Sequence, residues 1–420
     1  MNSVDGQQAG GNRAAARRSK AQPWPILRLG FRLFFWLDGV WAVAAMAIWI
    51  AIMSGTELFG GMELPLAAPG PLWHGHEFIF GYAFAVVAGF LFTAIPNWTG
   101  RLPVSGAPLA LLAGLWLLAR LAMMLGGAVD PVISAVGALA FPVVFTLLVA
   151  REILASGKIK NLPVLVALSC LVLADVVFQL GTIFDLAYHD IALRLAIAIL
   201  ALLIALIGSR VTPSFTRNWL AKRKATKMPA PMDIWDHIAM AVTAVALICW
   251  VVWPQAVGSA MALFAGAFTL ALRLSRWRGL HCWREPLLLV LHLGYAWLPV
   301  GLALLGWSIV STELAMADAQ HALTTGAVGT MTLAIMTRAS LGHSDRPLTA
   351  DGVTVAIFAL ITIAGMRRLW AGFAFDGYMT LISLSAAAWI GAFALFLVSY
   401  SPILFGHRKT TERWVPVDKA

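Results

Sequence analysis

Long apolar stretches, separated by short breaks of charged residues, glycine and proline, dominate the chain. A membrane-spanning helix needs about 20 predominantly apolar residues. Twelve windows of that kind can be read along the sequence, at 30–53, 72–95, 107–126, 132–153, 161–184, 191–209, 234–253, 255–276, 286–309, 318–339, 349–369 and 378–404. The pattern therefore predicts an all-α polytopic membrane protein with about twelve transmembrane helices.

The two ends of the chain differ from this apolar region. Residues 1–22 are polar and basic, and no apolar segment with a small-residue cleavage site follows soon enough to indicate a removable signal peptide. We expect residues 1–22 to form a disordered cytoplasmic tail, residues 23–404 the transmembrane domain, and residues 405–420 a cytoplasmic C-terminal tail.

Composition agrees with a membrane protein. Hydrophobic residues make up 60% of the chain and charged residues 12%, and the mean hydropathy is +0.82, whereas soluble domains carry about 25% charged residues. The three cysteines, Cys170, Cys249 and Cys282, lie far apart and form no CxxC pair. This spacing argues against a disulfide framework and against a thiolate zinc site.

The net charge of +10 is explained by membrane orientation. When the predicted helices alternate in direction, 26 of the 30 lysines and arginines fall on one side. The other side holds only Arg120, Arg194, Arg367 and Arg368. Because cytoplasmic loops carry the excess of basic residues, we expect both termini in the cytoplasm. The basic charge then indicates no nucleic-acid partner.

Polar residues stand at the outer end of the second predicted helix, in "WHGHE". A charged side chain at the centre of a spanning helix costs roughly 2.5–3.5 kcal/mol, so such residues need a reason. His74 and His76 are two positions apart, about 200° around a helix, and should face opposite ways. Glu77 can reach the ring of His74 and orient it. His321 lies at the matching depth in 318–339, so a two-histidine site would need both helices.

Other titratable residues leave alternatives open. His292 is surrounded by apolar residues in "LLLVLHLGYAWLPV", which fits a hydrogen bond to a neighbouring helix or a metal ligand or proton relay. His343 lies in the turn-rich "TRASLGHSDRPL". Asp38 and Asp175 are acids inside predicted helices, where they fit either a proton relay or plain interhelical hydrogen bonds. The remaining histidines lie in or beside polar loops, where we expect solvation: His189, His237, His281 and His407.

Weak internal similarity suggests three four-helix units. "PNWTGR" and "PSFTRN" end the second and sixth predicted helices, and "LRLGF" and "LHLGY" occur in the first and ninth. His76 precedes Arg101 by the same number of residues as His321 precedes Arg346. Single matches of this length occur by chance, but together they are coherent with a repeat.

Four segments resemble the NnrS family, and the resemblance extends from about residue 23 to residue 402. They are "PWPILRLGFRLFF", "WHGHEFIFGYAFAVVAGFLFTAIPNWTGR", "REPLLLVLHLGYAWLPVG" and "HALTTGAVGTMTLAIMTRASLGHSDRPL". The resemblance implies a bacterial inner-membrane protein that binds haem and copper and takes part in the response to nitric oxide. It leaves open whether the protein is an enzyme. The family's motif histidines correspond to His74, His76, His292, His321 and His343.

The predicted plan also looks like the catalytic subunit of haem–copper oxidases and nitric oxide reductases. In that superfamily the second and tenth helices carry haem-ligating histidines near the outer face. The chain departs from it in having no His-His pair, and only His189 and His237 stand at the ends of the sixth and seventh predicted helices. A superimposable binuclear metal site is therefore not expected, and the shared plan could be convergence.

Two classes of function remain. One is a haem and copper protein that binds, senses or turns over nitric oxide, since imidazole suits both metals. The other is a proton-coupled transporter with two six-helix halves and no metal. We predict the first, with His76 and His321 as haem ligands and His74 serving copper or the haem propionates under the influence of Glu77. His292 would support a second polar site in the inner half.

Overall fold

The computed structural model describes residues 24–55, 64–101, 103–374 and 376–407. The expected tail at 1–22 and most of the expected C-terminal tail, residues 408–420, lie outside these ranges. Regular structure in the described residues is helical throughout. In chain order the helices are η1 (Pro25–Leu27), α2 (Gly30–Ser54), α3 (Gly70–His76), η2 (Glu77–Ala83), α4 (Phe84–Thr99), α5 (Ala107–Leu125), η3 (Gly126–Ala128), α6 (Pro131–Ser156), η4 (Ile159–Asn161), α7 (Leu162–Phe184), α8 (His189–Lys222), α9 (Ile234–Val252), α10 (Val257–Ser275), η5 (Gly279–Cys282), α11 (Pro286–Val310), α12 (Met316–His321), η6 (Ala322–Gly329), α13 (Thr330–Gly342), α14 (Gly352–Ala371) and α15 (Tyr378–Leu404).

The predicted membrane architecture is confirmed. Within the described ranges, eleven helices are long and apolar enough to cross a membrane. The twelfth expected segment, 318–339, is the run α12, η6 and α13. It is more polar than the others because Asp318, Gln320, His321 and several threonines lie in it. The chain is thus a multi-pass, all-helical membrane protein.

The sixth spanning helix is longer than the sequence predicts. The apolar window ends at residue 209, but α8 continues through Pro213 to Lys222. Polar contacts hold the extra turns: Arg217 Nη2 donates to the carbonyl of Pro229 at 2.7 Å, and Trp219 Nε1 donates to Glu285 Oε2 at 3.1 Å. The connection between the sixth and seventh predicted helices, residues 210–233, is therefore helical over its first half.

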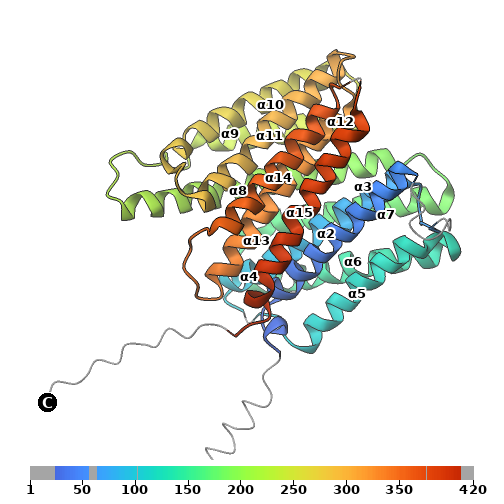
Figure 1. The fold of residues 1–420 in the computed structure, drawn as a ribbon, viewed down its shortest axis with the longest axis horizontal. Helices are drawn as coiled ribbons and strands as arrows, with labels where there is room; N and C mark the ends of the chain where they lie inside the picture. Colours follow the sequence, from blue (N-terminus) through green and yellow to red (C-terminus); the bar gives the residue numbers. More distant parts are fainter. Residues whose placement is uncertain (1–23, 56–63, 102, 375, 408–420) are drawn as a thin grey trace, which may run out of the picture.

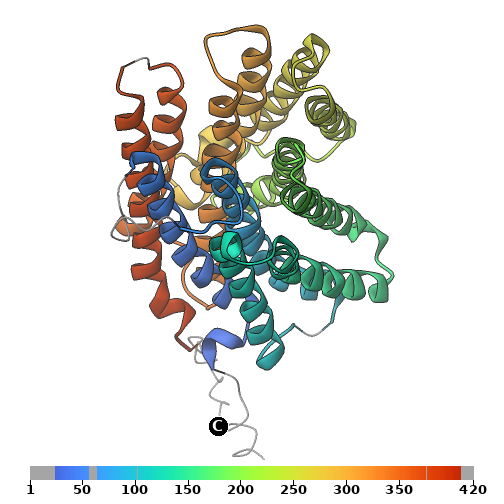
Figure 2. The ribbon, with the colours of Figure 1, turned by 90° about the vertical axis from the view of Figure 1, so that its right-hand side faces the viewer.

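The helices are arranged so that the chain's end returns to its beginning. The last helix, α15, packs against the first long helix, α2 (red beside blue in Figures 1 and 2). The second spanning helix lies inside the bundle, with 78% of its apolar window buried, compared with 39% for α2. Cavities described below lie between this helix, α8 and the run α12, η6 and α13. These are the second, sixth and tenth spans, which the proposed repeat makes equivalent; the repeat itself stays a prediction.

Two of these central helices contain a π-helical segment at the same place. η2 begins at Glu77, directly after His76, and η6 begins at Ala322, directly after His321. A π-helical turn inserts an extra residue into an α-helix and occurs frequently at functional sites. The histidines that precede the two segments, His76 and His321, are therefore candidates for a functional site.

Candidate functional site

A cavity of about 370 Å³ lies at the level where both π-helical segments begin. Residues of α2, α3, η2, α8, α12, η6, α14 and α15 line it. His74 and His321 both line this cavity, together with the indole rings of Trp49 and Trp389. We refer to it as the His74–His321 cavity. His76 is not among its lining residues, so the histidine pair that shares a cavity differs by two positions from the one expected.

The ring of His321 is held by its own helix. Its Nδ1 lies 2.7 Å from the carbonyl oxygen of Ala317, one turn earlier in α12. A carbonyl only accepts, so Nδ1 carries the hydrogen and the other nitrogen, Nε2, keeps its lone pair. This is the tautomer that a metal-ligating histidine adopts when the backbone orients its ring.

His74 is positioned by stacking. Its ring lies 4.5 Å from that of Trp49 in α2, with only 7° between the planes. Neither ring nitrogen of His74 forms a hydrogen bond within the described part of the chain. The stack fixes the plane of the imidazole, and the ring lines the cavity.

His76 faces the opposite way from His74, as helical geometry predicts, and is fully buried. Its Nε2 lies 3.0 Å from Asp175 Oδ1 in α7, and its Nδ1 lies 3.1 Å from Glu77 Oε1. Gln179 Nε2 donates to the same Asp175 oxygen at 3.2 Å. Asp175 and Gln179 therefore serve His76 by hydrogen bonding. Both ring nitrogens of His76 are engaged by carboxylates and not directed into the His74–His321 cavity.

Glu77 serves a different histidine from the one expected. The sequence suggests that it orients His74, but its carboxylate contacts His76 and the guanidinium of Arg120 in α5. Gly81 makes this possible, since a Cβ there would lie 2.4 Å from Arg120 Nη1 and 2.8 Å from Glu77 Oε2. The expectation fails because the π-helical turn and the neighbouring α5 place Arg120 beside Glu77.

The charges of this buried cluster can balance internally. When ionised, Glu77 and Asp175 contribute two negative charges, and Arg120 contributes one positive charge. An imidazole with hydrogens on both nitrogens donates to both carboxylates and supplies the second positive charge. Burial of charges is tolerated only with such pairing. The side chains of His76, Glu77, Arg120 and Asp175 therefore form an ionic cluster behind the cavity, in which Nε and Nη2 of Arg120 and Oδ2 of Asp175 have no hydrogen-bond partner among the described residues.

Another ion pair stands at the mouth of the cavity. Arg368 Nη1 of α14 donates to Asp318 Oδ1 of α12 at 2.6 Å, and Tyr378 OH donates to the same oxygen at 3.3 Å. Arg368 and Tyr378 also line the His74–His321 cavity. A guanidinium has five N–H donors, so Arg368 retains donors for an anionic group in the cavity.

The other two predicted site histidines lie elsewhere. His292 is buried; its Nε2 lies 3.0 Å from Thr216 Oγ1, and its Nδ1 has no hydrogen-bond partner in the described part of the chain. His343 packs against Phe31 with ring centroids 5.6 Å apart and lines a separate cavity near α13. Neither residue lines the His74–His321 cavity.

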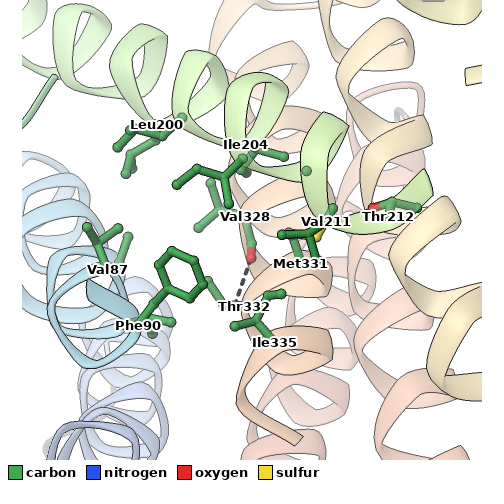
Figure 3. A pocket seen from close by; sticks show the side chains of 15 residues that line it. Val87, Phe90, Leu200, Ile204, Val211, Thr212, Val328, Met331, Thr332 and Ile335 are labelled. Carbon is green, nitrogen blue, oxygen red and sulfur yellow. Dashed lines mark hydrogen bonds between the residues drawn. The ribbon is translucent and has the colours of Figure 1, made fainter. Parts of the chain in front are cut away.

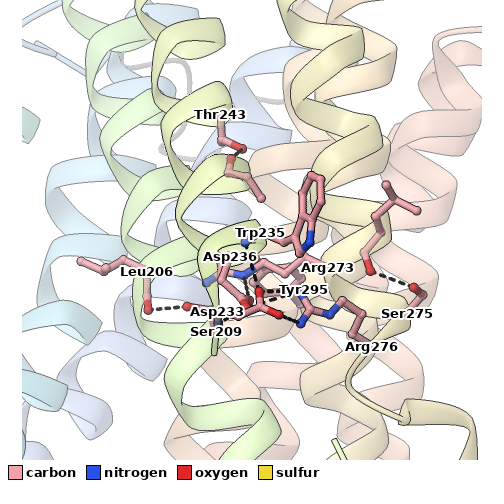
Figure 4. A network of polar contacts seen from close by, with 12 residues as sticks. Leu206, Ser209, Asp233, Trp235, Asp236, Thr243, Arg273, Ser275, Arg276 and Tyr295 are labelled. Carbon is pink, nitrogen blue, oxygen red and sulfur yellow. Dashed lines mark hydrogen bonds and ion pairs between the residues drawn. The ribbon is translucent and has the colours of Figure 1, made fainter. Parts of the chain in front are cut away.

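A second ionic cluster joins the ends of α9 and α10, and Figure 4 shows its members converging. Arg273 Nε donates to Asp236 Oδ1 at 2.8 Å, and Arg276 pairs with Asp233, which caps α9. The hydrogen bond from Arg276 lowers the pKa of Asp233, and Asp233 in turn raises the pKa of Arg276. This cluster borders none of the cavities described here. We assign it to helix packing.

Across the described residues, no group of three or more histidine, cysteine, aspartate or glutamate side chains is arranged to hold a metal ion. Two histidines at one cavity are still enough for a haem, because the porphyrin supplies the other four ligands of the iron.

Sequence reasoning missed Trp49, Arg120 and Arg368. A signal was present for the arginines. They belong to the four basic residues on the side of the predicted topology that holds few positive charges. An arginine placed against the charge bias needs a partner, and both have one: Arg120 pairs with Glu77 and Arg368 with Asp318.

Comparison with known proteins yields one result. The model of a protein family described as NnrS protein matches residues 25–408 of the chain. A search of curated proteins finds no match. The matched region covers nearly all of the chain and includes both π-helical segments and every histidine discussed above. The chain therefore belongs to the NnrS family, whose members are membrane proteins of the nitric oxide response.

Proposed function

We propose that this protein binds a haem in the His74–His321 cavity and that nitric oxide is the ligand it handles there. The observation that carries the proposal is the shared cavity: two histidines from the second and tenth spanning helices line it together. The distribution of lysines and arginines supports placing this cavity near the outer face of a bacterial inner membrane, with both termini in the cytoplasm.

The residues present fit the group. Pockets for cofactors of this size are mostly apolar, with a few polar groups and volumes of about 300–1,000 Å³, and this one measures about 370 Å³. The indoles of Trp49 and Trp389 offer flat walls to a flat macrocycle. Arg368 offers N–H donors to carboxylate groups at the cavity mouth.

Each residue has a separate task in this proposal. His321 holds the group through Nε2, with Ala317 fixing the ring orientation. His74 would supply the second ligand, and its ring is positioned by stacking on Trp49. Arg368 binds the propionates. When bound, haem iron supplies coordination of nitric oxide and one-electron redox chemistry.

This proposal replaces His76 by His74 as the partner of His321. Ligation by His76 would require Asp175 or Glu77 to give up a buried hydrogen bond. Copper is also associated with the family, and His292 is the candidate ligand apart from the haem site. Its Nε2 lies 3.0 Å from Thr216 Oγ1, and no group of three metal-ligating side chains surrounds it within the described part of the chain.

The test is the absorption spectrum and haem content of purified variants. We expect His74→Ala and His321→Ala to lose haem or change its ligation, whereas His76→Gln keeps the haem of the native protein. Addition of nitric oxide to the reduced native protein should shift the Soret band. His76→Gln is the matched control, because it removes an imidazole two residues from His74 and keeps a hydrogen-bonding side chain.

Two outcomes would contradict the proposal. Loss of haem in His76→Gln, with an unchanged spectrum in His74→Ala, would restore His76 as the ligand. A native protein that is colourless and free of iron would remove the haem altogether. Solute movement by that protein in liposomes would then support a proton-coupled transporter.

A further inference from the structure

A second cavity, of about 530 Å³, lies at the other end of the central helices. Its walls come from α2, α4, α7, α8 and α13 and include the aromatic rings of Phe35, Phe90, Trp98 and Phe215. Two arginines, Arg210 of α8 and Arg338 of α13, line it, and no aspartate or glutamate does. We refer to it as the Arg210–Arg338 cavity.

Neither arginine forms an ion pair with any described residue. Arg338 places its guanidinium over the ring of Phe215, 3.9 Å from the centroid. This stack uses the face of the guanidinium and leaves its N–H edge available. Glu285 is the carboxylate whose charge acts on Arg338. It does not line the cavity, and it accepts a hydrogen bond from Trp219 Nε1 at 3.1 Å. Two arginine side chains therefore face one cavity that no carboxylate lines.

An apolar pocket continues from this cavity toward the middle of the helices. Phe90, Ile207, Val211 and Ile335 line both spaces. Beyond them the pocket passes between α4, α8 and η6, where Figure 3 shows Val87, Leu200, Ile204 and Val328 facing one another. Its volume is about 90 Å³, so it is narrow.

We propose that the Arg210–Arg338 cavity binds an anionic phospholipid, with its phosphate between the arginines and part of an acyl chain in the apolar pocket. Basic pockets between transmembrane helices on the cytoplasmic side bind anionic lipid headgroups. The two arginines lie in the set of basic residues that the sequence assigns to that side. A free anion would leave the apolar pocket unexplained, and a neutral quinone would leave both charges uncompensated. The proposal does not depend on haem.

The experiment uses the full-length protein, stripped of lipid in detergent. Phosphatidylglycerol and phosphatidylethanolamine with identical acyl chains are added, and bound lipid is counted by native mass spectrometry. The midpoint of thermal unfolding is measured on the same samples. We expect phosphatidylglycerol to be retained and to raise the midpoint more than phosphatidylethanolamine does. Inorganic phosphate should give no comparable shift.

Variants of the protein separate recognition of the lipid headgroup from recognition of the acyl chain. We expect Arg338→Gln and Arg210→Gln each to weaken phosphatidylglycerol binding about fivefold, since one basic contact to an anionic lipid contributes about 1 kcal/mol. Val211→Phe should weaken binding by filling the apolar pocket while the charge is unchanged. Arg284→Gln is the matched control. Arg284 also stacks on an aromatic ring, that of Trp283 at 4.8 Å, but does not line the cavity.

The proposal is overturned if the two lipids bind equally well, or if Arg284→Gln weakens binding as much as Arg338→Gln. Stabilisation by inorganic phosphate equal to that by phosphatidylglycerol would make this a free-anion site. Because native protein alone distinguishes the two lipids, the test holds even if one variant fails to fold. Loss of haem binding elsewhere would not alter any of these outcomes.

Discussion

The two π-helical segments occupy matching places in the fold but differ in their surroundings. η2 is enclosed by charge: His76 precedes it, Glu77 begins it, and Arg120 and Asp175 approach from α5 and α7. η6 contains no ionisable residue, and its buried members are small or aliphatic side chains and threonines. Its charged neighbours lie at the cavity mouth, outside the segment.

This difference shows how one local structure can serve two tasks. Around η2, both ring nitrogens of His76 form hydrogen bonds with carboxylates of the protein. Around η6, His321 makes a single hydrogen bond to its own helix and keeps a nitrogen for the cavity. Capacity to bind a ligand therefore depends on what the neighbouring helices leave unpaired, and not on the π-helical turn itself.

The largest expected effect is that of Arg120→Met, which leaves the carboxylate of Glu77 buried without its cation. Removing one partner of a buried ion pair costs about 3–5 kcal/mol. Arg368→Met, at the mouth near η6, should cost about 1.5–3 kcal/mol, the range for a hydrogen bond to a charged group. The measurement is the free energy of unfolding in mild detergent.

Arg101→Met is the control for this pair of variants, because the side chain of Arg101 is 41% exposed in its pair with Glu152. Exposed pairs contribute about 0–1 kcal/mol. If Arg120→Met destabilises no more than Arg101→Met, η2 is not held by the ionic cluster of His76, Glu77, Arg120 and Asp175, and the contrast with η6 disappears.

An intermediate effect is expected from glycine replacements in the two segments. A Cβ at Gly81 would meet Arg120 at 2.4 Å, and a Cβ at Gly326 would meet Trp297 at 2.6 Å. Each alanine variant should lose about 1–3 kcal/mol through overpacking. Only the loss of stability caused by Gly81→Ala should become smaller when Arg120 is also replaced by Met. Thermal unfolding of single and double variants measures this coupling.

Gly114→Ala serves as the control for the glycine variants, since nothing lies within 4 Å of its built Cβ. It should stabilise α5 by about 0.5–1 kcal/mol. Equal coupling of Gly81 and Gly326 to Arg120 would mean that the two segments share one network after all.

The smallest expected change in the free energy of unfolding comes from replacing Thr330, the residue directly after η6. The Oγ1 of Thr330 is buried without a hydrogen-bond partner among the described residues. Thr330→Val should therefore be neutral or stabilise by up to about 1 kcal/mol. Thr337→Val should cost about 0.5–1.5 kcal/mol, since its Oγ1 donates to the carbonyl of Leu333 at 2.8 Å. Destabilisation by both to the same degree would reveal an unseen partner at Thr330.

The sequence predicts the membrane-spanning helices well because apolar length is a property of each segment alone. It also predicts that His74 and His76 face opposite ways, because helical periodicity is local. It cannot predict which of the two meets His321, since that depends on the rotation of one helix against another. The spacing argument that favoured His76 assumes equal register in the second and tenth helices, and the structure orients the two differently.

Glycines give a similar lesson. Gly81 and Gly326 each follow a site histidine by five residues, and the sequence allows either close helix packing or contact with a flat cofactor. Both meet protein side chains, Arg120 and Trp297 respectively. Close packing is therefore what these glycines permit, and only the three-dimensional neighbours could decide this.

The contact between α2 and α15 has a consequence for biosynthesis. Buried Arg32 in α2 donates to the carbonyls of Leu404 at 3.0 Å and Gly406 at 2.6 Å, at the far end of the chain. During translation the first helix reaches the membrane long before these acceptors exist. Until Leu404 and Gly406 are synthesised, Arg32 lacks these two acceptors, and its long side chain can reach toward the lipid headgroups instead. Ribosome stalling or truncation before residue 404 would leave the first helix without its final partner.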